Sequence, residues 1–343
     1  MNILVTGGSG FIGTNLVTDL LKEGHNVTIY DKLKSETYPD LCIVADVRDK
    51  EMLTRSMRGI NAVYHLAAEH RDDVQPTSLY YDVNVGGAEN IIFALKENNV
   101  NQLIYTSTVA VYGLNSGTPY EESPINPFND YGKSKYEAET IFNKWADFDR
   151  SHCLITVRPT VIFGEKNRGN VYNLLYQLSS GKFIKVGKGI NRKSMAYVLN
   201  LTSFLSSLLK SEPGQFVYNY ADKPDLSMNE LIDVFYSTIG KNHKNNIQIP
   251  YTFGLMGGYC YDILSKITGK IYPISSIRIK KFCADTVVSA EKVKDTGFIA
   301  PYLLTDGLKR MILSEVLQKP NRNNPNDVKV EDAVDPRRPF EEK

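Results

Sequence analysis

Short apolar segments alternate with longer amphipathic segments through the first half of the chain. Six apolar runs are typical of buried strands: NILVTG, NVTIYD, LCIVAD, AVYHLA, QLIYTST and CLITVRP. The segments between them, such as GTNLVTDLLKEG, repeat their apolar positions with the spacing of a helix that packs on a sheet. Strands that alternate with helices in this way predict an α/β fold with a doubly wound parallel sheet.

The regular alternation weakens after about residue 165. Further helices and strands follow, and the run QFVYNYA is apolar enough to rejoin the central sheet. We therefore expect one domain from residues 1–165 with 191–222, and a smaller α/β C-terminal domain from residues 166–190 with 223–318. Residues 319–343 are polar and rich in proline, a composition that predicts a disordered tail.

The charge balance and the cysteines argue against several classes of protein. The chain has 40 basic and 39 acidic residues, so no overall charge favours nucleic acid as a partner. The four cysteines are far apart and form no CxxC pair, which favours reduced thiols over a zinc site. No apolar run reaches the roughly 18 residues of a membrane-spanning helix, and the first residues do not resemble a signal peptide. We expect a cytoplasmic protein, soluble or at most bound to a membrane surface.

The glycines of VTGGSGFIGTNL lie between the first predicted strand and the first predicted helix. In this context Gly7 permits a tight turn, Gly10 lets the backbone approach a pyrophosphate, and Gly13 allows close packing of helix on sheet. The N-terminus of the helix would also attract the phosphates. A flexible turn is the alternative, but the order strand, turn, helix favours a dinucleotide site.

Asp31 ends the second predicted strand, at the distance from the glycines where an acid accepts the hydroxyls of the adenosine ribose. A carboxylate there would repel the 2′-phosphate of NADP, so we predict NAD as the cofactor. Lys32 and Lys34 favour the opposite choice, because a cation could hold that phosphate. Asp31 could also be a simple turn former at the strand end.

The stretch DYGKSKYEAE sets Tyr131 and Lys135 four residues apart near the start of a predicted helix. The two side chains would share one face of that helix. Many solvated surface pairs have this spacing, so the stretch by itself does not distinguish chemistry from a polar surface.

Seven motifs in a fixed order give the chain a family resemblance. They are TGGSGFIG, DVRD, HLAA, NV at Asn84, STVAVYG, YGKSK and RPTVIFG, and they cover about residues 1–165. Together they resemble the extended short-chain dehydrogenase/reductase family, in its NAD-dependent epimerase/dehydratase branch. The resemblance implies a Rossmann domain that binds NAD and a smaller C-terminal domain that binds the substrate.

The resemblance implies catalytic roles for three residues. Tyr131 and Lys135 match the family's YxxxK pair, in which the tyrosine is the base and the lysine also bonds the nicotinamide ribose. A tyrosine with an ordinary pKa near 10 is a poor base at neutral pH, but a neighbouring ammonium favours the phenolate. Thr108 matches the hydroxyl that bonds the reacting sugar oxygen, whereas Ser107 is the weaker candidate for that role.

The resemblance also implies a wider set of contacts. His65 is expected to be structural rather than a base, and Arg158 to be structural within RPTVIFG. Asp46 and Val47 should lie at the adenine, and Asn84 should hold a loop beside the cofactor. The expected cofactor contacts are Gly7, Gly10, Phe11, Ile12, Gly13, Asp31, Asp46, Val47, Leu66, Ala67, Ala68, Asn84, Ser107, Tyr131, Lys135, Pro159 and Val161.

Residues after Thr108 favour one reaction of the family over another. Dehydratases of the family carry Thr-Asp-Glu, because elimination of water needs an acid and a base beside the threonine, whereas Val109 and Ala110 follow Thr108 here. The resemblance therefore implies a sugar 4-epimerase, in which NAD takes a hydride from C4, a 4-keto sugar turns over, and the hydride returns to the other face. A simple reductase is the alternative.

Two features bear on the substrate. Nucleotide-sugar epimerases commonly carry Arg-Asp-aromatic where this chain has RKSMAYV, so UDP binding is in doubt, although Arg192 or Lys193 could hold a diphosphate. The stretch AAEHRDDVQPTSLYYDVNV and the segment from residue 250 to 285 resemble epimerases that convert N-acetylglucosamine to N-acetylgalactosamine on undecaprenyl diphosphate, a lipid carrier of bacterial surface polysaccharides such as the O-antigen of lipopolysaccharide. The expected substrate contacts are Thr108, Glu69, Asn170, Arg192 and Lys193, with a helix cap as the alternative for Asn170.

Residues 251–281 combine aromatic and apolar side chains with cations, which suits contact with a membrane surface. The alternative is an ordinary domain whose apolar residues form its core. The stretch EHRDD is not expected to bind a metal, because consecutive residues rarely converge on one ion. A UDP-glucose or UDP-N-acetylglucosamine 4-epimerase and a non-catalytic dinucleotide sensor are the alternative functions, and a homodimer is expected from the family.

Overall fold

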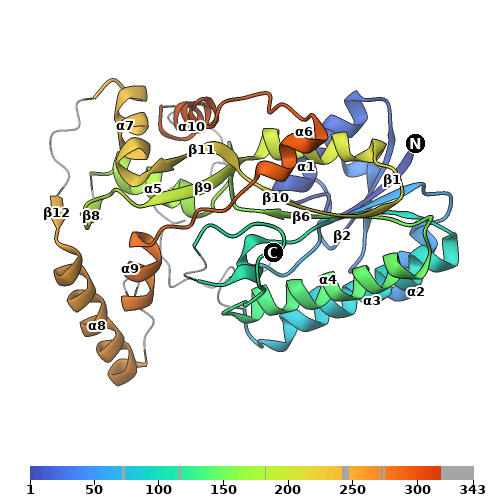
Figure 1. Ribbon diagram of the computed structural model, residues 1–343, viewed down its shortest axis with the longest axis horizontal. Helices are drawn as coiled ribbons and strands as arrows, with labels where there is room; N and C mark the ends of the chain where they lie inside the picture. Colours follow the sequence, from blue (N-terminus) through green and yellow to red (C-terminus); the bar gives the residue numbers. More distant parts are fainter. Residues whose placement is uncertain are drawn as a thin grey trace. The chain divides into compact units, whose positions relative to one another are not determined.

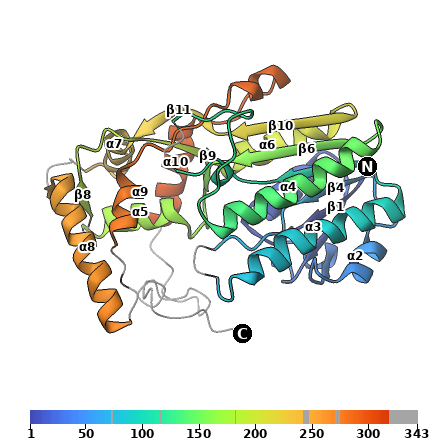
Figure 2. The same cartoon turned by 60° about the horizontal axis from the view of Figure 1, so that its bottom comes forward.

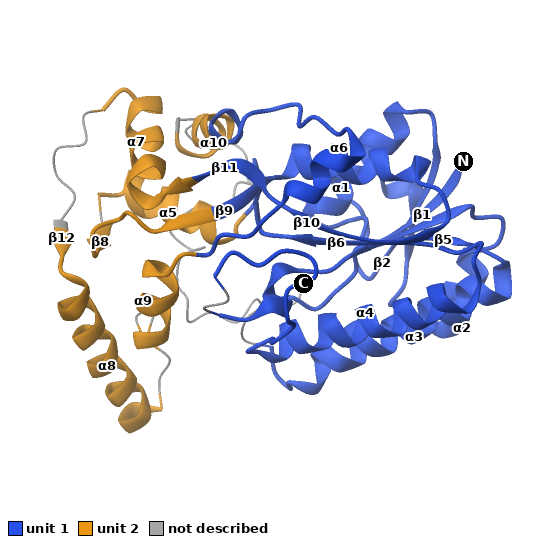
Figure 3. Cartoon of the chain, viewed as in Figure 1, with its two compact units in different colours: residues 1–167, 194–225, 286–307 blue, residues 168–193, 226–285, 308–343 orange. Residues whose placement is uncertain are grey.

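The computed structural model describes residues 1–71, 74–114, 117–181, 183–241, 247–269, 272 and 275–317 (Figure 1). The tail predicted for residues 319–343 lies outside this part of the chain. The chain divides into two compact units, which are coloured separately in Figure 3. Unit 1 comprises residues 1–167, 194–225 and 286–307, and unit 2 comprises residues 168–193, 226–285 and 308–343.

Unit 1 is built on a seven-stranded sheet in the order β10-β6-β5-β4-β1-β2-β3, and all its neighbouring strands run parallel. The predicted doubly wound α/β fold is therefore confirmed. The apolar runs form these strands because their side chains are buried on both faces of the sheet. The strands are β1 (Asn2–Thr6), β2 (Asn26–Asp31), β3 (Cys42–Val44), β4 (Ala62–His65), β5 (Gln102–Thr106), β6 (Cys153–Pro159) and β10 (Gly214–Tyr220).

Helices cover both faces of this sheet (Figure 1). On one face the cluster contains Leu16 and Leu20 of α1 with Leu201 and Phe204 of α6. On the other face the cluster contains residues of α2, α3 and α4, including Leu53, Ile91 and Phe142; Figure 2 shows α3 and α4 alongside one another. The helices are α1 (Phe11–Lys22), α2 (Lys50–Ser56), α3 (Ser78–Asn98), α4 (Asp130–Phe148) and α6 (Val198–Ser207).

Several short elements accompany the central sheet, and two of the strands among them extend into unit 2. A three-stranded sheet has the order β11-β9-β7, and the stretch RKSMAY forms its central strand. Residues 286–307, expected in the C-terminal domain, cluster with unit 1. The elements are β7 (Val161–Phe163), β9 (Arg192–Tyr197), β11 (Asp222–Ser227), and the short helices η1 (Pro39–Leu41), η2 (Val109–Tyr112), η3 (Leu208–Lys210) and η4 (Glu291–Thr296).

Unit 2 is mostly helical, with a two-stranded parallel sheet of β12 and β8. Its apolar Gly- and Tyr-rich stretch, for which the sequence predicted no particular element, forms the helix α8. The elements are α5 (Asn170–Ser179), β8 (Ile184–Val186), α7 (Met228–Thr238), β12 (Ile247–Ile249), α8 (Tyr251–Thr268), α9 (Ser276–Cys283), α10 (Leu304–Ile312, which begins in unit 1) and η5 (Leu313–Leu317).

Candidate active site

The glycine loop joins the end of β1 to the start of α1. Gly7 has a φ of +71°, and a Cβ there would lie 2.7 Å from the backbone nitrogen of Ala67. A Cβ on Gly13 would overlap the carbonyl oxygen of Gly7. Gly10 is the N-cap of α1. Because it has no side chain, a ligand could approach the backbone at Phe11 and Ile12 closely. This tight, glycine-rich turn at a helix N-terminus fits the pyrophosphate of a dinucleotide.

Asp31 lies at the end of β2 and is held against the glycine loop. Its carboxylate accepts hydrogen bonds from the backbone nitrogens of Ser9 and Leu33, both at 3.0 Å. The Nζ atom of Lys32 lies 4.0 Å from a carboxylate oxygen of Glu69, so this cation already has an anionic neighbour. The arrangement fits the ribose hydroxyls of NAD better than the 2′-phosphate of NADP.

The loop after β4 runs beside the glycine loop. The backbone nitrogen of Leu66 donates to the Thr6 carbonyl at 3.0 Å, and that of Ala67 to the Thr6 hydroxyl at 3.4 Å. Asn84 of α3 accepts from the Glu69 nitrogen at 2.9 Å and donates to the Glu69 carbonyl at 3.1 Å. The loop residues Leu66, Ala67, Ala68 and Glu69 are thus fixed by backbone contacts at both ends.

His65 is buried at the end of β4. Its Nδ1 lies 2.8 Å from the Thr6 hydroxyl, and its ring stacks on Tyr105 at a centroid distance of 5.5 Å. Burial lowers the pKa of His65 to about 3, with a further contribution from the charge of Lys135. A neutral, enclosed imidazole of this kind is a packing residue.

Tyr131 and Lys135 occupy the first two turns of α4. The helix begins where the Asn129 side chain accepts from the Gly132 nitrogen at 2.9 Å. Tyr131 is half-buried, with its ring 6.5 Å from that of Tyr80. Lys135 is 2% exposed, and its Nζ donates to the Thr106 carbonyl at 2.8 Å. Lys135 therefore reaches the carboxyl end of β5, where ligands bind in doubly wound sheets.

Burial lowers the pKa of the Lys135 ammonium to about 7, and the carboxylate of Glu139 partly opposes this shift. Tyr105 also contacts Lys135 twice: its ring lies 4.3 Å below the Nζ atom, and its hydroxyl donates to the Lys135 carbonyl at 3.3 Å. Tyr105 was not among the predicted site residues, because only the fold brings β5 beside α4.

Ser107 and Thr108 follow β5 directly. The Thr108 hydroxyl oxygen accepts from the Ala110 nitrogen at 3.1 Å, which leaves its hydrogen as the donor of that group. Among the described residues the buried Ser107 hydroxyl has no hydrogen-bond partner. A buried hydroxyl without a partner at the end of a central strand is a candidate contact for a bound ligand.

A buried ion pair supports α4 one turn beyond Lys135. Arg158 of β6 donates to Glu139 through Nε at 3.0 Å and through a terminal nitrogen at 2.6 Å. The same guanidinium donates to the Tyr112 hydroxyl at 2.7 Å and to the Glu121 carbonyl at 3.1 Å. Arg158 is thus surrounded by structural partners, as predicted. Its partner Glu139, which supports α4 beside Lys135, was not predicted from the sequence.

The remaining predicted cofactor contacts lie at other strand ends. Both carboxylate oxygens of Asp46 accept hydrogen bonds from the Arg48 side chain, at 3.0 and 2.8 Å, and this contact lowers the pKa of Asp46. Val47 is buried against Gly87 of α3. Pro159 ends β6, and Val161, which is exposed, begins β7.

Three predicted substrate contacts belong to other elements. Asn170 begins α5, whose N-cap is Gly169, so the alternative role of Asn170 as the N-cap is not observed. The Arg192 side chain is half-exposed, and a terminal guanidinium nitrogen lies 3.6 Å from a carboxylate oxygen of Glu230. The Lys193 Nζ donates to the carbonyls of Lys281 at 3.0 Å and Ala284 at 2.6 Å, and burial lowers its pKa. Within unit 2, Lys193 therefore holds the C-terminal end of α9.

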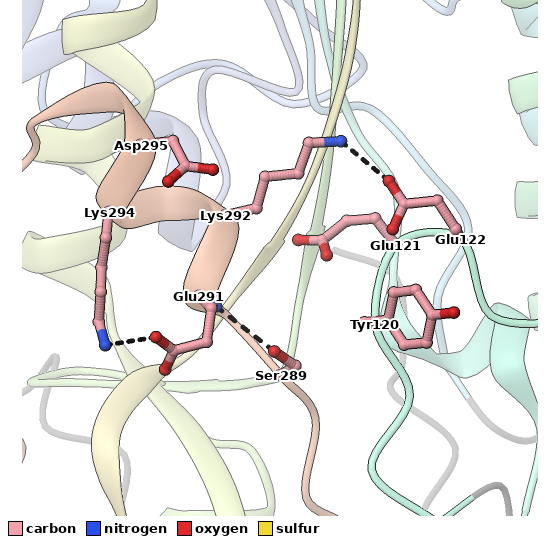
Figure 4. Close-up of a pocket in the computed structure, with 8 residues that line it drawn as sticks. All are labelled: Tyr120, Glu121, Glu122, Ser289, Glu291, Lys292, Lys294 and Asp295. Atoms are coloured by element: carbon pink, nitrogen blue, oxygen red, sulfur yellow. Dashed lines mark hydrogen bonds and ion pairs between the residues drawn. The ribbon is translucent and has the colours of Figure 1, made fainter.

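A shallow pocket of about 400 Å³ lies elsewhere in unit 1 (Figure 4). Figure 4 shows its two lysines pointing to carboxylates, Lys292 to Glu122 at 3.2 Å and Lys294 to Glu291 at 2.5 Å. No predicted site residue lines it, and we assign it no ligand. Across the described ranges no group of three or more His, Cys, Asp or Glu side chains is arranged to hold a metal ion; Asp72 and Asp73 of EHRDD lie outside them.

The chain resembles several known proteins. It is 51% identical to the N-acetyl-α-D-glucosaminyl-diphospho-ditrans,octacis-undecaprenol 4-epimerase of Escherichia coli O157:H7, over 92% of this chain and 95% of that relative. It is 35% identical to the UDP-glucose 4-epimerase of Lactobacillus helveticus, over 84% and 95% of the two chains. The UDP-glucose 4-epimerase of Bifidobacterium longum, solved with NAD⁺ and UDP, has the same fold with a TM-score of 0.71 at 22% identity, over 94% and 99%.

The family model that matches describes the NAD dependent epimerase/dehydratase family, and it covers residues 3–221. That range includes the glycine loop, Asp31 and the Tyr131–Lys135 pair. The chain belongs to the NAD dependent epimerase/dehydratase family, as the predicted resemblance implied.

Proposed function

We propose that the protein is an NAD-dependent 4-epimerase that interconverts N-acetylglucosamine and N-acetylgalactosamine on undecaprenyl diphosphate. The observation that carries the proposal is the 51% identity, along almost the full length of both chains, to a relative named for that 4-epimerase reaction on diphospho-undecaprenol. Catalysis is supported over a dinucleotide sensor without chemistry because the chain keeps Tyr131 and Lys135, and the Lys135 Nζ bonds the Thr106 carbonyl two residues before Thr108.

The residues at the carboxyl ends of the strands fit NAD. The glycine loop would hold the pyrophosphate, Asp31 the adenosine ribose, and Lys135 the nicotinamide ribose. When bound, NAD supplies a group that takes a hydride from C4 of the sugar and returns it. The chain's own residues move the proton and orient the substrate.

Tyr131 is the proposed base for the sugar 4-hydroxyl. Its position in the first turn of α4 places it near a positive helix end, and Lys135 on the next turn favours the phenolate while its amine is protonated. When the ketone is reduced again, the same phenol gives the proton back. Thr108, with its hydroxyl oxygen bonded to the Ala110 nitrogen, would donate to the sugar oxygen and hold it beside Tyr131.

The residues at the start of η2 lack the side chains that dehydration would need. Elimination of water would need an acid and a base directly after Thr108, and the two positions there are Val109 and Ala110. The keto sugar would therefore stay intact until the hydride returns. Return to either face of C4 gives a mixture of the two epimers.

The lipid-linked substrate implies a place for the reaction. The enzyme would work at the cytoplasmic face of the membrane, through contact of residues 251–281, and its product would enter a bacterial surface polysaccharide such as the O-antigen of lipopolysaccharide. The homodimer expected from the family remains a prediction, and light scattering of the purified protein tests it.

The 35% identity to a UDP-glucose 4-epimerase favours a second candidate, a nucleotide-sugar epimerase. A direct test compares two substrates of the purified protein, N-acetylglucosaminyl diphosphoundecaprenol and UDP-N-acetylglucosamine. Hydrolysis of each product and identification of the amino sugar shows which one is converted. Galactosamine released only from the lipid-linked sample supports the proposal, and galactosamine released only from the UDP sample contradicts it.

A further inference from the structure

The helix α8 has its polarity reversed with respect to an ordinary surface helix. Its buried positions, Gly254 and Gly258, carry no side chain, and Asp262 and Ser265 follow on the same face. A surface helix normally buries an apolar stripe and exposes polar residues. Here the inward side consists of two glycines and two polar residues, with the half-buried Leu255 beside them.

Close packing on the inner face accounts for the glycines. A Cβ on Gly254 would lie 2.5 Å from a methyl group of Val186 in β8, and one on Gly258 would lie 2.8 Å from the backbone of Ser276 in α9. The Asp262 carboxylate accepts from the Ser276 nitrogen at 3.3 Å. These close contacts with β8 and α9 therefore fix the rotation of α8 about its axis.

The outer face of α8 is a stripe of large apolar side chains. Their spacings of three, seven and four residues place them on one side of the helix, opposite the glycines. We call these residues the outer stripe: Phe253 (65% exposed), Met256 (63%), Ile263 (59%) and Ile267 (76%). Single exposed apolar residues are common, but a contiguous exposed stripe marks an interaction surface.

The charges around the outer stripe favour an anionic partner. Between residues 251 and 284 the sequence has five basic residues and one acidic residue, Asp262, whose carboxylate faces α9. Lys266 lies on α8 itself, and the Lys280 Nζ lies 5.5 Å from the ring of Tyr259 at the edge of the stripe. Two copies of this surface would repel each other, whereas a bilayer with anionic lipids would attract it.

The chain's own C-terminal residues do not match this surface. Residues 319–343 contain no Leu, Ile or Met and a single aromatic residue, Phe340. The described residues include no helix that could cross a membrane.

We propose that α8 lies in the interface of an anionic membrane, with Phe253, Met256, Ile263 and Ile267 inserted among the lipids and Lys266 and Lys280 at the headgroup level. The inference deepens the proposed function, on which it rests for a membrane-held substrate, by naming the face that contacts the bilayer. The apolar side chains supply burial and the lysines supply attraction.

Vesicle co-sedimentation of the full chain without substrate tests the proposal. We expect binding to vesicles of phosphatidylcholine with phosphatidylglycerol, weaker binding to phosphatidylcholine alone, and release by salt. Ile263→Glu should lower the partition coefficient at least about tenfold, because a charge replaces an inserted side chain. Lys280→Glu should lower it by more than about fivefold, because the removal of one positive charge near an anionic surface alone has about that effect and the glutamate adds a negative charge.

Ile299→Glu is the matched control, since Ile299 is an 86% exposed isoleucine of unit 1. Equal binding by the wild type and Ile263→Glu would overturn the proposal. So would a change from dimer to monomer in Ile263→Glu, seen by light scattering, with vesicle binding intact, because the stripe would then be a contact between copies.

The proposed membrane contact and the proposed reaction can be tested independently. Conversion of the lipid-linked substrate in detergent, without wild-type binding to vesicles, would overturn the membrane face and leave the proposed reaction standing. Vesicle binding that depends on the outer stripe, without conversion of the substrate, would support the membrane face and contradict the reaction.

Discussion

Arg158 and Glu139 form a buried, two-point ion pair, with nitrogen-to-oxygen distances of 3.0 and 2.6 Å, one helical turn beyond Lys135. The pair joins β6 to α4 behind the proposed catalytic residues. Because both side chains are almost fully buried and shielded from water, each charge is compensated by the other.

We predict that Glu139→Gln destabilises the protein by about 3–5 kcal/mol, since it leaves the Arg158 cation buried and unpaired. The double variant Glu139→Gln with Arg158→Met should recover much of that loss. Denaturant unfolding of the wild type, both single variants and the double variant measures the coupling. Additive effects of the two substitutions would show that the pair is not coupled in this way.

Lys135 gives a prediction about pH. Its pKa is lowered to about 7 in the folded protein by burial, below its value in the unfolded chain. The unfolded chain therefore holds the proton at pH values where the folded protein has released it. Stability should rise with pH above about pH 7, by up to about 1.4 kcal/mol per pH unit from this group. Lys135→Met should remove this rise, and chemical unfolding of both proteins between about pH 7 and pH 9 measures it. An equal rise in Lys135→Met would assign the effect to other groups.

Asp31 should determine the choice of dinucleotide. Asp31→Asn removes the charge and one of the two acceptors that bond the nitrogens of Ser9 and Leu33. We expect NAD to bind about tenfold more weakly and NADP to be rejected less strongly. Fluorescence titration with each dinucleotide measures both effects, and Asp233→Asn, at an exposed position of α7, is the control. Tighter binding of NADP than of NAD by the wild type would contradict the assignment.

The Ser107 hydroxyl should contribute to the binding or reaction of a ligand and not to the stability of the fold. Ser107→Ala should leave stability unchanged or slightly higher, because the hydroxyl has no protein partner among the described residues. It should lower kcat/KM by about tenfold if the hydroxyl bonds the sugar or the cofactor. Thr156→Val is the matched control, since that buried hydroxyl in β6 likewise has no partner in the described part of the chain. Unchanged kcat/KM in Ser107→Ala would remove Ser107 from the site.

The parts predicted well from the sequence are those that depend on local pattern. Most of the apolar runs become long, largely buried strands of the central sheet, and Gly13 is needed for a contact with Gly7, six residues away. β7 and β9 were missed because three to six residues carry too weak a periodic signal.

Features that depend on distant residues could not be predicted in detail. The partners Arg158 and Glu139 are 19 residues apart and meet only because β6 lies beside α4. The amphipathic pattern of α8 looks the same whether the apolar face is buried or exposed. Only the close approach of Gly254 and Gly258 to their neighbours shows which face is turned inward.

The central claim is that Tyr131 takes the proton of the 4-hydroxyl of a lipid-linked amino sugar, while bound NAD would take the C4 hydrogen as a hydride and return it. The most direct test uses N-acetylglucosaminyl diphosphoundecaprenol deuterated at C4, with the wild type and Tyr131→Phe. We predict that the N-acetylgalactosamine product keeps the deuterium and that Tyr131→Phe converts at least about a hundredfold more slowly while still binding NAD. Loss of the label to water, or full turnover by Tyr131→Phe, would contradict the account.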